Sequence, residues 1–467
     1  MTHLDKPGRL RDSLRLVTLA GCLAMVFVAA VGSPMATDYF QKLGFTEVEF
    51  GIMGGIPMIM VGMQFLGALW SNHLRSRRAA FMALIIAGRV LWLGVVLAPL
   101  LPLSVSWRTT LILTLMALSS LLQNLGPPIW FSWMGDLIPR RIISRYWGRR
   151  MRWMYVVWLV TYGPLVLFGF RYEAWGFSLA QAFSLVVALG VIAGVVDIVL
   201  FLWVWEPEPV VARSRPVLET ILEPWRQHEF RSYMEWNCAY SASVMLGAAF
   251  MLLYVIKVLE LPLWQVMIMW WVPGIGSAAT SDLWGRLIDR HGSRPILVLC
   301  TALKPLAPLM FFVITRETAF WGLGLFFVVD SALNMGAQLA TNGFMLRMAP
   351  RENRGMFVAA IASLPGIAGG LAAIAGGYLL KLWEGHNIEL LGRVWDNYQY
   401  LFLLSTVLRA LCIPLALRIK EPASAEPLDV LAAIIEDWPS RLVSFPTYLF
   451  RRLTGKGAAA PGPARKP

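Results

Sequence analysis

The sequence predicts an all-α membrane protein of about twelve transmembrane helices, arranged as two six-helix bundles with both chain ends in the cytoplasm. Of the 467 residues, 57% are hydrophobic and only 15% are charged, whereas soluble globular chains carry about 25% charged residues. Apolar runs of about 20 residues, the length that crosses the hydrocarbon core as a helix, recur from end to end. The alternation of polar and apolar residues that marks membrane-spanning strands does not occur.

Twelve apolar segments bounded by charged residues, proline or glycine are the predicted spanning helices. They cover residues 14–37, 48–72, 79–101, 107–134, 150–170, 177–205, 233–258, 262–288, 295–314, 317–345, 356–383 and 398–417. The first segment follows a polar, basic stretch and is longer than the apolar core of a signal peptide. We therefore expect it to be retained as the first helix.

The lysines and arginines indicate which side of the membrane each loop faces. One set of alternate loops, together with the two chain ends, holds 31 of the 41 basic residues, and the other set holds seven. Because basic residues stay on the cytoplasmic side, both ends are expected in the cytoplasm and the protein in the cell inner membrane. Topology thus explains the formal charge of +13, and we expect no nucleic-acid partner.

A polar stretch in the middle of the chain divides the twelve segments into six and six. The expected units are an N-terminal bundle (residues 1–205), a cytoplasmic linker (206–232), a C-terminal bundle (233–418) and a cytoplasmic tail (419–467). Within the tail, residues 427–453 form either an amphipathic helix on the membrane face or a loosely ordered segment. The last residues, rich in Gly, Ala and Pro, are expected to be disordered.

The two halves carry corresponding marks in corresponding loops. A glycine-rich and arginine-rich mark begins at Gly67 after the second segment and at Gly285 after the eighth. A second mark begins at Pro139 after the fourth segment and at Pro350 after the tenth. The copies are 218 and 211 residues apart, and such similar spacings predict duplicated six-helix units, the parallel repeats of many secondary transporters.

These loops resemble those of the major facilitator superfamily, whose loop after the second helix and its counterpart after the eighth follow the pattern G-x-L-x-D-R-x-G-R. The matching residues of the C-terminal copy are Gly285, Leu287, Asp289, Arg290, Gly292 and, one residue late, Arg294. The N-terminal copy departs from the pattern, with Ser71 at the acidic position and Leu74 at the glycine. The resemblance covers about residues 14–418 and implies a transporter that works by alternating access.

The C-terminal copy also predicts a conformational latch. Asp289 can pair with arginines or with the N-terminus of a helix, Gly292 allows a tight turn, and Arg290 and Arg294 can bind carbonyls and headgroups. Such a cluster would hold helices together on the cytoplasmic side and would break when that side opens. The resemblance also implies that this loop acts as a conformational latch. Topology signalling by the arginines alone is the alternative. Because Ser71 carries no charge, we expect an asymmetric latch.

Polar residues inside the predicted helices are candidates for the substrate site, because an unpaired polar group in the membrane is costly. The resemblance implies that the first, fourth, seventh and tenth helices line a central cavity. The candidates in these helices are Gln123, Asn124, Asn237, Tyr240, Asp330, Asn334 and Gln338.

The tenth helix carries the most informative pattern. Asp330, Asn334, Gln338 and Asn342 recur every four residues, which places them on one helical face. This stripe either lines an aqueous cavity, which we favour, or makes hydrogen bonds between packed helices.

Two carboxylates, Asp330 and Glu235, are the leading candidates for proton coupling, and Asp197 and Asp282 are further ones. A carboxylate withdrawn from water holds its proton more firmly, so Asp330 can exchange a proton during transport. Lys304, Arg409 and Arg89 are candidate partners for acids in the membrane, Asp197 among them. Structural ion pairs explain these residues equally well.

The sequence therefore favours a secondary active transporter of a small organic solute, with proton coupling as a further hypothesis. The candidate cavity residues offer amides, hydroxyls and few charges, which favours a neutral or weakly charged solute. A transporter-like lipid-handling protein or receptor is the alternative. Since there is no nucleophile elbow, metal-ligand spacing or phosphate-binding loop, we expect neither an enzyme nor a cofactor. The expected partners are the solute, protons and membrane lipids, and the chain is expected to be a monomer.

Overall fold

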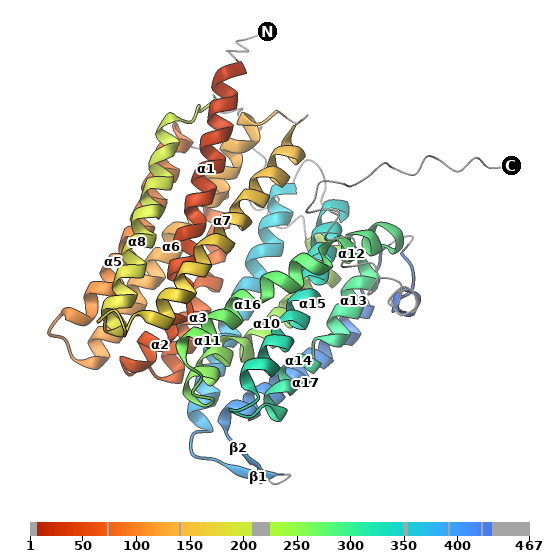
Figure 1. The fold of residues 1–467 in the computed structure, drawn as a ribbon. Coiled ribbons are helices and arrows are strands. Elements are labelled where there is room, and N and C mark those ends of the chain that lie inside the picture. Colours follow the sequence, from red (N-terminus) through yellow and green to blue (C-terminus); the bar gives the residue numbers. More distant parts are fainter. Residues whose placement is uncertain are drawn as a thin grey trace, which may run out of the picture.

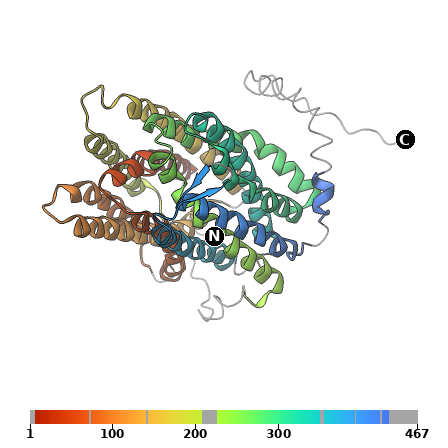
Figure 2. The same cartoon turned by 90° about the horizontal axis from the view of Figure 1, so that it is seen from below.

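Apolar segments fold as helices in a membrane because a helix satisfies each backbone N–H and C=O group within itself. A computed structural model of the chain describes residues 7–71, 74–139, 142–207, 225–348, 354–390, 393–421 and 424–431, and this part is almost entirely helical. The long helices run side by side in two bundles (Figure 1, and from below in Figure 2). The predicted all-α fold with two bundles is confirmed, and the cytoplasmic position of both chain ends stays a prediction.

The N-terminal bundle contains the first six crossings. Its elements are α1 (Pro7–Val31), α2 (Pro34–Lys42), α3 (Glu47–Met60), the 3-10 helix η1 (Val61–Met63), α4 (Gln64–Ser71), α5 (Arg77–Leu97), η2 (Ala98–Leu100), α6 (Val105–Leu137), α7 (Ile143–Arg171), α8 (Leu179–Val199) and η3 (Leu200–Trp203). The first crossing is interrupted between α1 and α2, because Pro34 has no N–H to continue the hydrogen bonds of α1.

The C-terminal bundle contains the other six crossings and a short hairpin. Its elements are α10 (His228–Lys257), α11 (Leu263–Trp271), α12 (Pro273–His291), α13 (Ser293–Leu303), α14 (Leu306–Val313), α15 (Ala319–Met348), α16 (Arg354–Leu382), β1 (Ile388–Leu390), β2 (Arg393–Trp395) and α17 (Asn397–Leu417). The two strands pair antiparallel, with Ile388 opposite Trp395. They lie at the end of the molecule opposite to the start of α1 (Figure 1).

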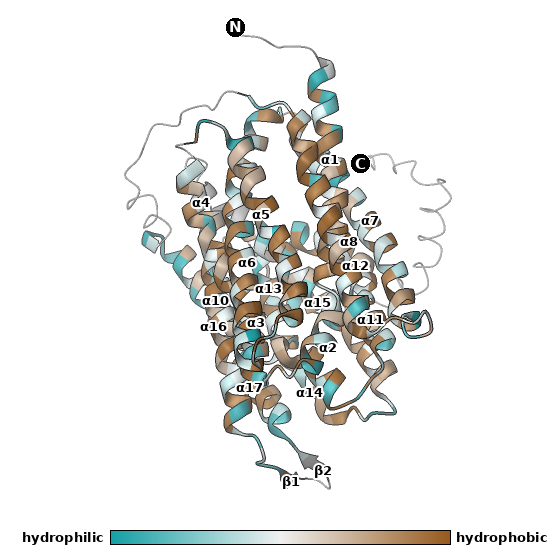
Figure 3. Ribbon diagram, turned by 90° about the vertical axis from the view of Figure 1, so that its left-hand side faces the viewer, coloured by the Kyte–Doolittle hydropathy of each residue, from teal (hydrophilic) through white to brown (hydrophobic). Residues whose placement is uncertain are grey.

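In the described part of the chain, eleven helices are long and apolar enough to cross a membrane. The remaining predicted crossing, the eighth (262–288), is divided at Pro273 into α11, of 9 residues, and α12, of 19 residues. Proline accounts for the division, and α12 is polar because it carries Asp282, Arg286 and Asp289. Hydrophobic residues dominate the middle of the helices, and the start of α1 is hydrophilic (Figure 3).

The two bundles meet along α3 and α16, where small residues let the backbones approach closely. A Cβ atom added to Gly55 would lie 2.5 Å from the carbonyl oxygen of Gly370, and one added to Gly370 would lie 2.6 Å from that of Gly55. Further along, the Ser363 hydroxyl donates to the Val61 carbonyl at 3.1 Å. The glycines of α16 therefore form the contact between the bundles.

The predicted linker and tail lie mostly outside the described residues. The described part of the linker ends at residue 207 and resumes at 225, and α10 begins five residues before the predicted boundary at 233. Of the segment 427–453, residues 427–431 are helical, and Val430 packs in the core of the C-terminal bundle.

Candidate substrate and coupling site

Asp330 lies in the middle of α15, on the tenth crossing, and faces the end of α13. Its Oδ1 atom lies 2.6 Å from Lys304 Nζ, and its Oδ2 atom accepts a hydrogen bond of 2.8 Å from Asn334, one turn further along α15. The Lys304 side chain is 4% exposed and that of Asp330 is 21% exposed. The pair thus combines an enclosed cation with a carboxylate that remains accessible.

The polar stripe of α15 continues beyond this pair as an exposed face. Asn334, Gln338 and Asn342 are all exposed. Ser331, beside Asp330, is instead buried, and its hydroxyl donates to the Val328 carbonyl at 2.9 Å. Amides exposed at four-residue spacing favour a face that meets water or solute over one that seals two helices together.

Two side chains from other helices reach the Lys304–Asp330 pair. Arg409 of α17 is 5% exposed, and its guanidinium donates to the carbonyls of Lys304 at 3.4 Å and Val244 at 3.3 Å. Its charge interacts with Asp330 and with Tyr240 of α10. Tyr240 in turn stacks on Trp236. The seventh, ninth, tenth and twelfth crossings therefore converge at Asp330.

The N-terminal bundle contains a different kind of ion pair. Arg89 of α5 binds Asp197 of α8 and also donates to the carbonyl of Gly194. Asp197 is 1% exposed and Arg89 is 7% exposed. Because both partners are enclosed, this pair fits the structural role considered from the sequence better than proton exchange.

Two candidate substrate residues of the fourth crossing make contacts with neighbouring helices. Gln123 donates to the Ser119 hydroxyl at 2.9 Å, and its side chain packs where a Cβ atom on Gly88 of α5 would lie. Asn124 donates to the carbonyl of Ser120 and accepts a hydrogen bond of 3.3 Å from Gln64 of α4. These contacts favour helix packing for both residues.

The candidates on α10 differ in their surroundings. Asn237 is partly buried. Glu235 is 56% exposed and lies 3.7 Å from Arg231, one turn earlier. An exposed ion pair of this spacing contributes little to stability. Glu235 therefore differs from Asp330, whose partner Lys304 is enclosed.

The predicted latch residues lie at the end of α12 and the start of α13. Gly292 has a φ angle of 95°, the left-handed region that favours glycine. The Arg294 backbone N–H donates to the Glu421 carboxylate at 2.6 Å, and its guanidinium lies 3.6 Å from Glu426. Gly285 is partly buried, and Asp289 and Arg290 are exposed. Both acidic partners of Arg294 follow α17, so these contacts lie within the C-terminal bundle.

A matching cluster at the start of α5 contains a residue that the sequence analysis missed. Glu206 accepts hydrogen bonds from the Ser76 hydroxyl at 2.9 Å and from the Arg77 and Arg78 backbone N–H groups at 2.6 and 3.0 Å. The buried Arg77 side chain lies 2.6 Å from Asp136. Glu206 and Glu421 are 215 residues apart and each precedes a proline. This repeated Glu-Pro pair was a usable sequence signal.

At the hairpin end of the molecule, a polar contact joins the two bundles. Glu47, at the start of α3, binds Lys257 at the end of α10 and accepts a hydrogen bond of 3.2 Å from the Tyr398 hydroxyl of α17. Nearby, Phe170 of α7 packs edge-on against Trp264 of α11, with ring centroids 5.5 Å apart. The bundles are therefore closed against each other on this side.

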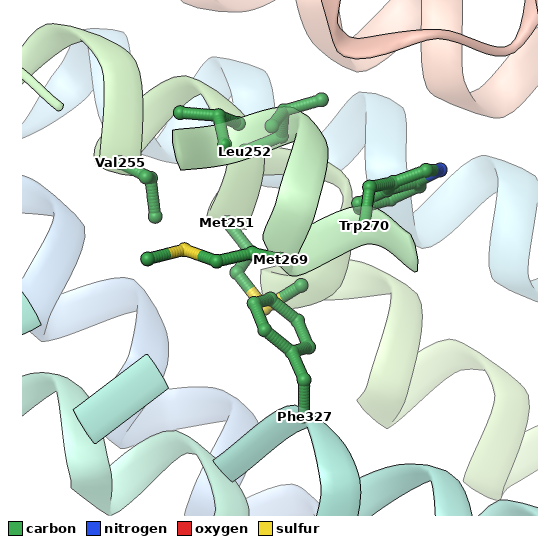
Figure 4. A pocket seen from close by; sticks show the side chains of 7 residues that line it. Met251, Leu252, Val255, Met269, Trp270 and Phe327 are labelled. Atoms are coloured by element: carbon green, nitrogen blue, oxygen red, sulfur yellow. The ribbon is translucent and has the colours of Figure 1, made fainter. Parts of the chain in front are cut away.

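A small apolar cavity lies apart from these polar groups, among α10, α11 and α15 (Figure 4). Its lining residues are Met251, Leu252, Val255, Val266, Met269, Trp270 and Phe327. The cavity measures about 10 Å³, room for a single water-sized molecule. It does not fit an organic solute.

Comparisons with known proteins identify the family and the fold of the chain. The family model described as Major Facilitator Superfamily matches residues 17–373 and again residues 265–454. A comparison with curated proteins found no match.

Several solved structures share the fold. The crystal structure of a mutant of the nucleoside transporter NupG gives a TM-score of 0.67 at 12% identity, covering 88% of this chain and 100% of that chain. A D-xylose-proton symporter gives 0.65 at 10% identity, covering 89% and 99%. A bacterial homolog of the human lysosomal transporter Spinster, in an inward-facing and unoccupied conformation, gives 0.57 at 15% identity, covering 89% and 95%. At these identities the likeness concerns the fold alone.

Proposed function

The chain belongs to the major facilitator superfamily, and from this premise we propose that it is a secondary active transporter of a small organic solute, coupled to protons through Asp330. The observation that carries the proposal is the Lys304–Asp330 ion pair, whose carboxylate stays accessible at the head of an exposed polar stripe. A buried lysine with an accessible counter-ion is unusual in a membrane interior unless the site exchanges ions or solute. The fold of a D-xylose-proton symporter is compatible with this coupling.

The proposed mechanism is alternating access between two rigid units. Residues 1–205 and 233–418 move against each other about the central polar face, with the linker and tail on the cytoplasmic side of the inner membrane. The Glu47–Lys257 contact supports a state closed at the hairpin end. In this mechanism the glycine contact of α3 and α16 is the sliding surface. The residues at Gly285, Asp289, Arg290, Gly292 and Arg294 form the cytoplasmic latch.

The substrate residues proposed from the structure are Asp330, Asn334, Gln338 and Tyr240, with Asn237 nearby on α10. Gln123 and Asn124 are assigned to helix packing, because the Gln123 side chain packs against Gly88 of α5 and the Asn124 amide accepts a hydrogen bond from Gln64 of α4. We propose no covalent chemistry for these groups, and the proposed function is transport.

The test is a proton flux measured in proteoliposomes. The purified protein is reconstituted with a pH-sensitive dye inside the vesicles, and solutes are added outside from a broad panel. A saturable, solute-dependent acidification that needs the protein supports coupled transport. If no solute moves protons or accumulates, and only lipids stabilise the purified chain, the lipid-handling alternative replaces the proposal.

A further inference from the structure

The two bundles carry charged residues at corresponding positions of the repeat but combine them differently. Arg89 of α5 and Lys304 of α13 are 215 residues apart, and Asp197 of α8 and Arg409 of α17 are 212 residues apart. In the N-terminal bundle the two positions hold a cation and an anion, which pair with each other. In the C-terminal bundle both positions hold cations, so Lys304 takes its counter-ion from Asp330 on a third helix.

Arg409 lacks a counter-ion of its own in the described part of the chain. Its guanidinium reaches two backbone carbonyls, both at 3.3 Å or more, and its Nε atom is buried without a hydrogen-bond partner. The acidic group with which its charge interacts is Asp330, which already binds Lys304. The cluster therefore encloses two positive charges and one negative charge.

The other groups around Asp330 do not supply the second negative charge that the two cations lack. Tyr240 from α10, Cys300 from α13 and Cys412 from α17 lie close to the cluster. From α12, the Ser277 hydroxyl approaches the neighbouring Ser331 carbonyl at 3.3 Å. Each of these side chains is neutral in its common form, so the excess positive charge remains.

Building on the transport function proposed above, we propose that the solute carries a single negative charge, as a carboxylate does, and that this charge replaces Asp330 as the counter-ion of Lys304 and Arg409. A proton from the medium binds Asp330 and leaves the two cations without a counter-ion. The solute anion then restores the original balance. One proton and one anion together leave the charge of the cluster unchanged, so their joint transfer is electroneutral.

The exposure of the pair supports this order of events. Asp330 is the accessible partner and Lys304 lies behind it. An anion that approaches along the polar stripe meets the Asp330 carboxylate first and is repelled while that group is ionised. Protonation removes the repulsion and opens the cations to the solute. The sequence alone favoured a neutral or weakly charged solute; the enclosed charges change that expectation to a monovalent anion.

The test compares carboxylates with their neutral amides on the purified protein. The probes are benzoate and lactate, with benzamide and lactamide as matched controls, and binding is measured by thermal stabilisation. Asp330→Asn mimics the protonated carboxyl, so it should bind both carboxylates about tenfold more tightly than the wild type near neutral pH. The amides should show no such gain. Adding Lys304→Met to Asp330→Asn should abolish the gain.

Asp197→Asn is the control for neutralising a buried carboxylate, because it makes the same change in the pair of the other bundle. It should leave carboxylate binding at the level of the wild type, without the tenfold gain. If Asp330→Asn does not fold, the carboxylates should stabilise the wild-type protein more at about pH 5.5 than at about pH 7.5, because the proposed binding requires a proton. Equal stabilisation by acids and amides in every variant and at both pH values overturns the proposal.

The outcome separates this inference from the transport proposal. Coupled transport of a neutral solute, with no preference for carboxylates, would leave the proposed function standing and refute the anion site. Carboxylate binding that depends on Asp330 without uptake into proteoliposomes would keep the site and refute transport.

Discussion

Lys304 Nζ and Asp330 Oδ1 lie 2.6 Å apart across α13 and α15, and the Asp330 side chain is the more accessible of the two, at 21% against 4% for Lys304. In the Arg89–Asp197 pair of the other bundle, both side chains are enclosed. The Asp330 carboxylate is partly accessible, so it can meet water or solute without opening of the bundle. This asymmetry is the reason why we propose proton coupling in the C-terminal bundle.

The first prediction concerns the proton dependence of uptake. Asp330→Asn removes the titrating group, so acidification outside proteoliposomes should no longer stimulate uptake, whereas the wild type should respond severalfold. Uptake is measured with an imposed pH difference and with none. Glu229→Gln, which neutralises an exposed carboxylate in the first turn of α10, serves as the control and should keep the full response. Stimulation that persists in Asp330→Asn would clear this residue of the role.

The second prediction concerns the Arg89–Asp197 pair. Removing one partner leaves an uncompensated buried charge, which costs about 3–5 kcal/mol. Arg89→Met and Asp197→Leu should therefore each lower thermal stability in detergent strongly. The double variant should recover most of the loss, because replacing both partners by apolar groups of similar size is often nearly neutral. Additive losses in the double variant would show that the two side chains act independently.

Periodicity and charge were enough to predict the helices and the groups that could form ion pairs. The twelve segments follow from apolar length, and the scarcity of charge in the membrane made Lys304, Arg409 and Arg89 candidate partners without deciding which acid each would bind. The eighth crossing was predicted as one helix because Pro273 lies within an apolar run. Its division into α11 and α12 depends on how the chain bends at that proline, which composition does not specify.

Side-chain partners on neighbouring helices were not predictable in the same way. Gln123 and Asn124 have the same residue types as Asn334 and Gln338, and only the positions of α4 and α5 distinguish packing from lining. Glu206 and Glu421 lie outside the apolar segments, so a search limited to membrane residues passed over them. Glu206 follows Arg89 in the sequence by the same number of residues as Glu421 follows Lys304. A comparison of the two halves would therefore have identified both glutamates.

The third prediction concerns the contact at the hairpin end. Glu47→Gln weakens the link to Lys257 and Tyr398 by about 1 kcal/mol, which shifts the balance between closed and open states about fivefold. The shift is measured by the rate at which an impermeant thiol reagent modifies Val48→Cys, in a chain without its four natural cysteines. Exchanging the charges, with Glu47→Lys and Lys257→Glu together, should restore the slow rate. An unchanged rate in Glu47→Gln would show that other contacts hold this side closed.

The fourth prediction concerns the glycine contact between the bundles. In Gly370→Ala the new methyl group would lie 2.6 Å from the Gly55 carbonyl oxygen, a backbone atom that cannot move alone. The helices must separate, so uptake and thermal stability should both fall. Gly324→Ala is the matched control, because a Cβ atom there has no neighbour within 4 Å. Equal behaviour of the two variants would indicate that α3 and α16 slide or separate without cost.

The fifth prediction concerns the asymmetry of the cytoplasmic latch. Asp289 is exposed beside Arg290, whereas Ser71, at the corresponding position of the other bundle, is buried and uncharged. In the N-terminal bundle α5 is already joined to α6 through Arg77 and Asp136, and to the end of the sixth crossing through Glu206. A charge at the position of Ser71 is therefore not needed to hold these helices together. Asp289→Asn should therefore reduce the uptake rate severely, while Ser71→Ala should leave it near that of the wild type.

The measurement that checks this asymmetry compares the uptake rates of the two variants at equal protein density. Similar losses in both would mean that the two loops act alike and that the charge of Asp289 has no special part in closing the cytoplasmic side.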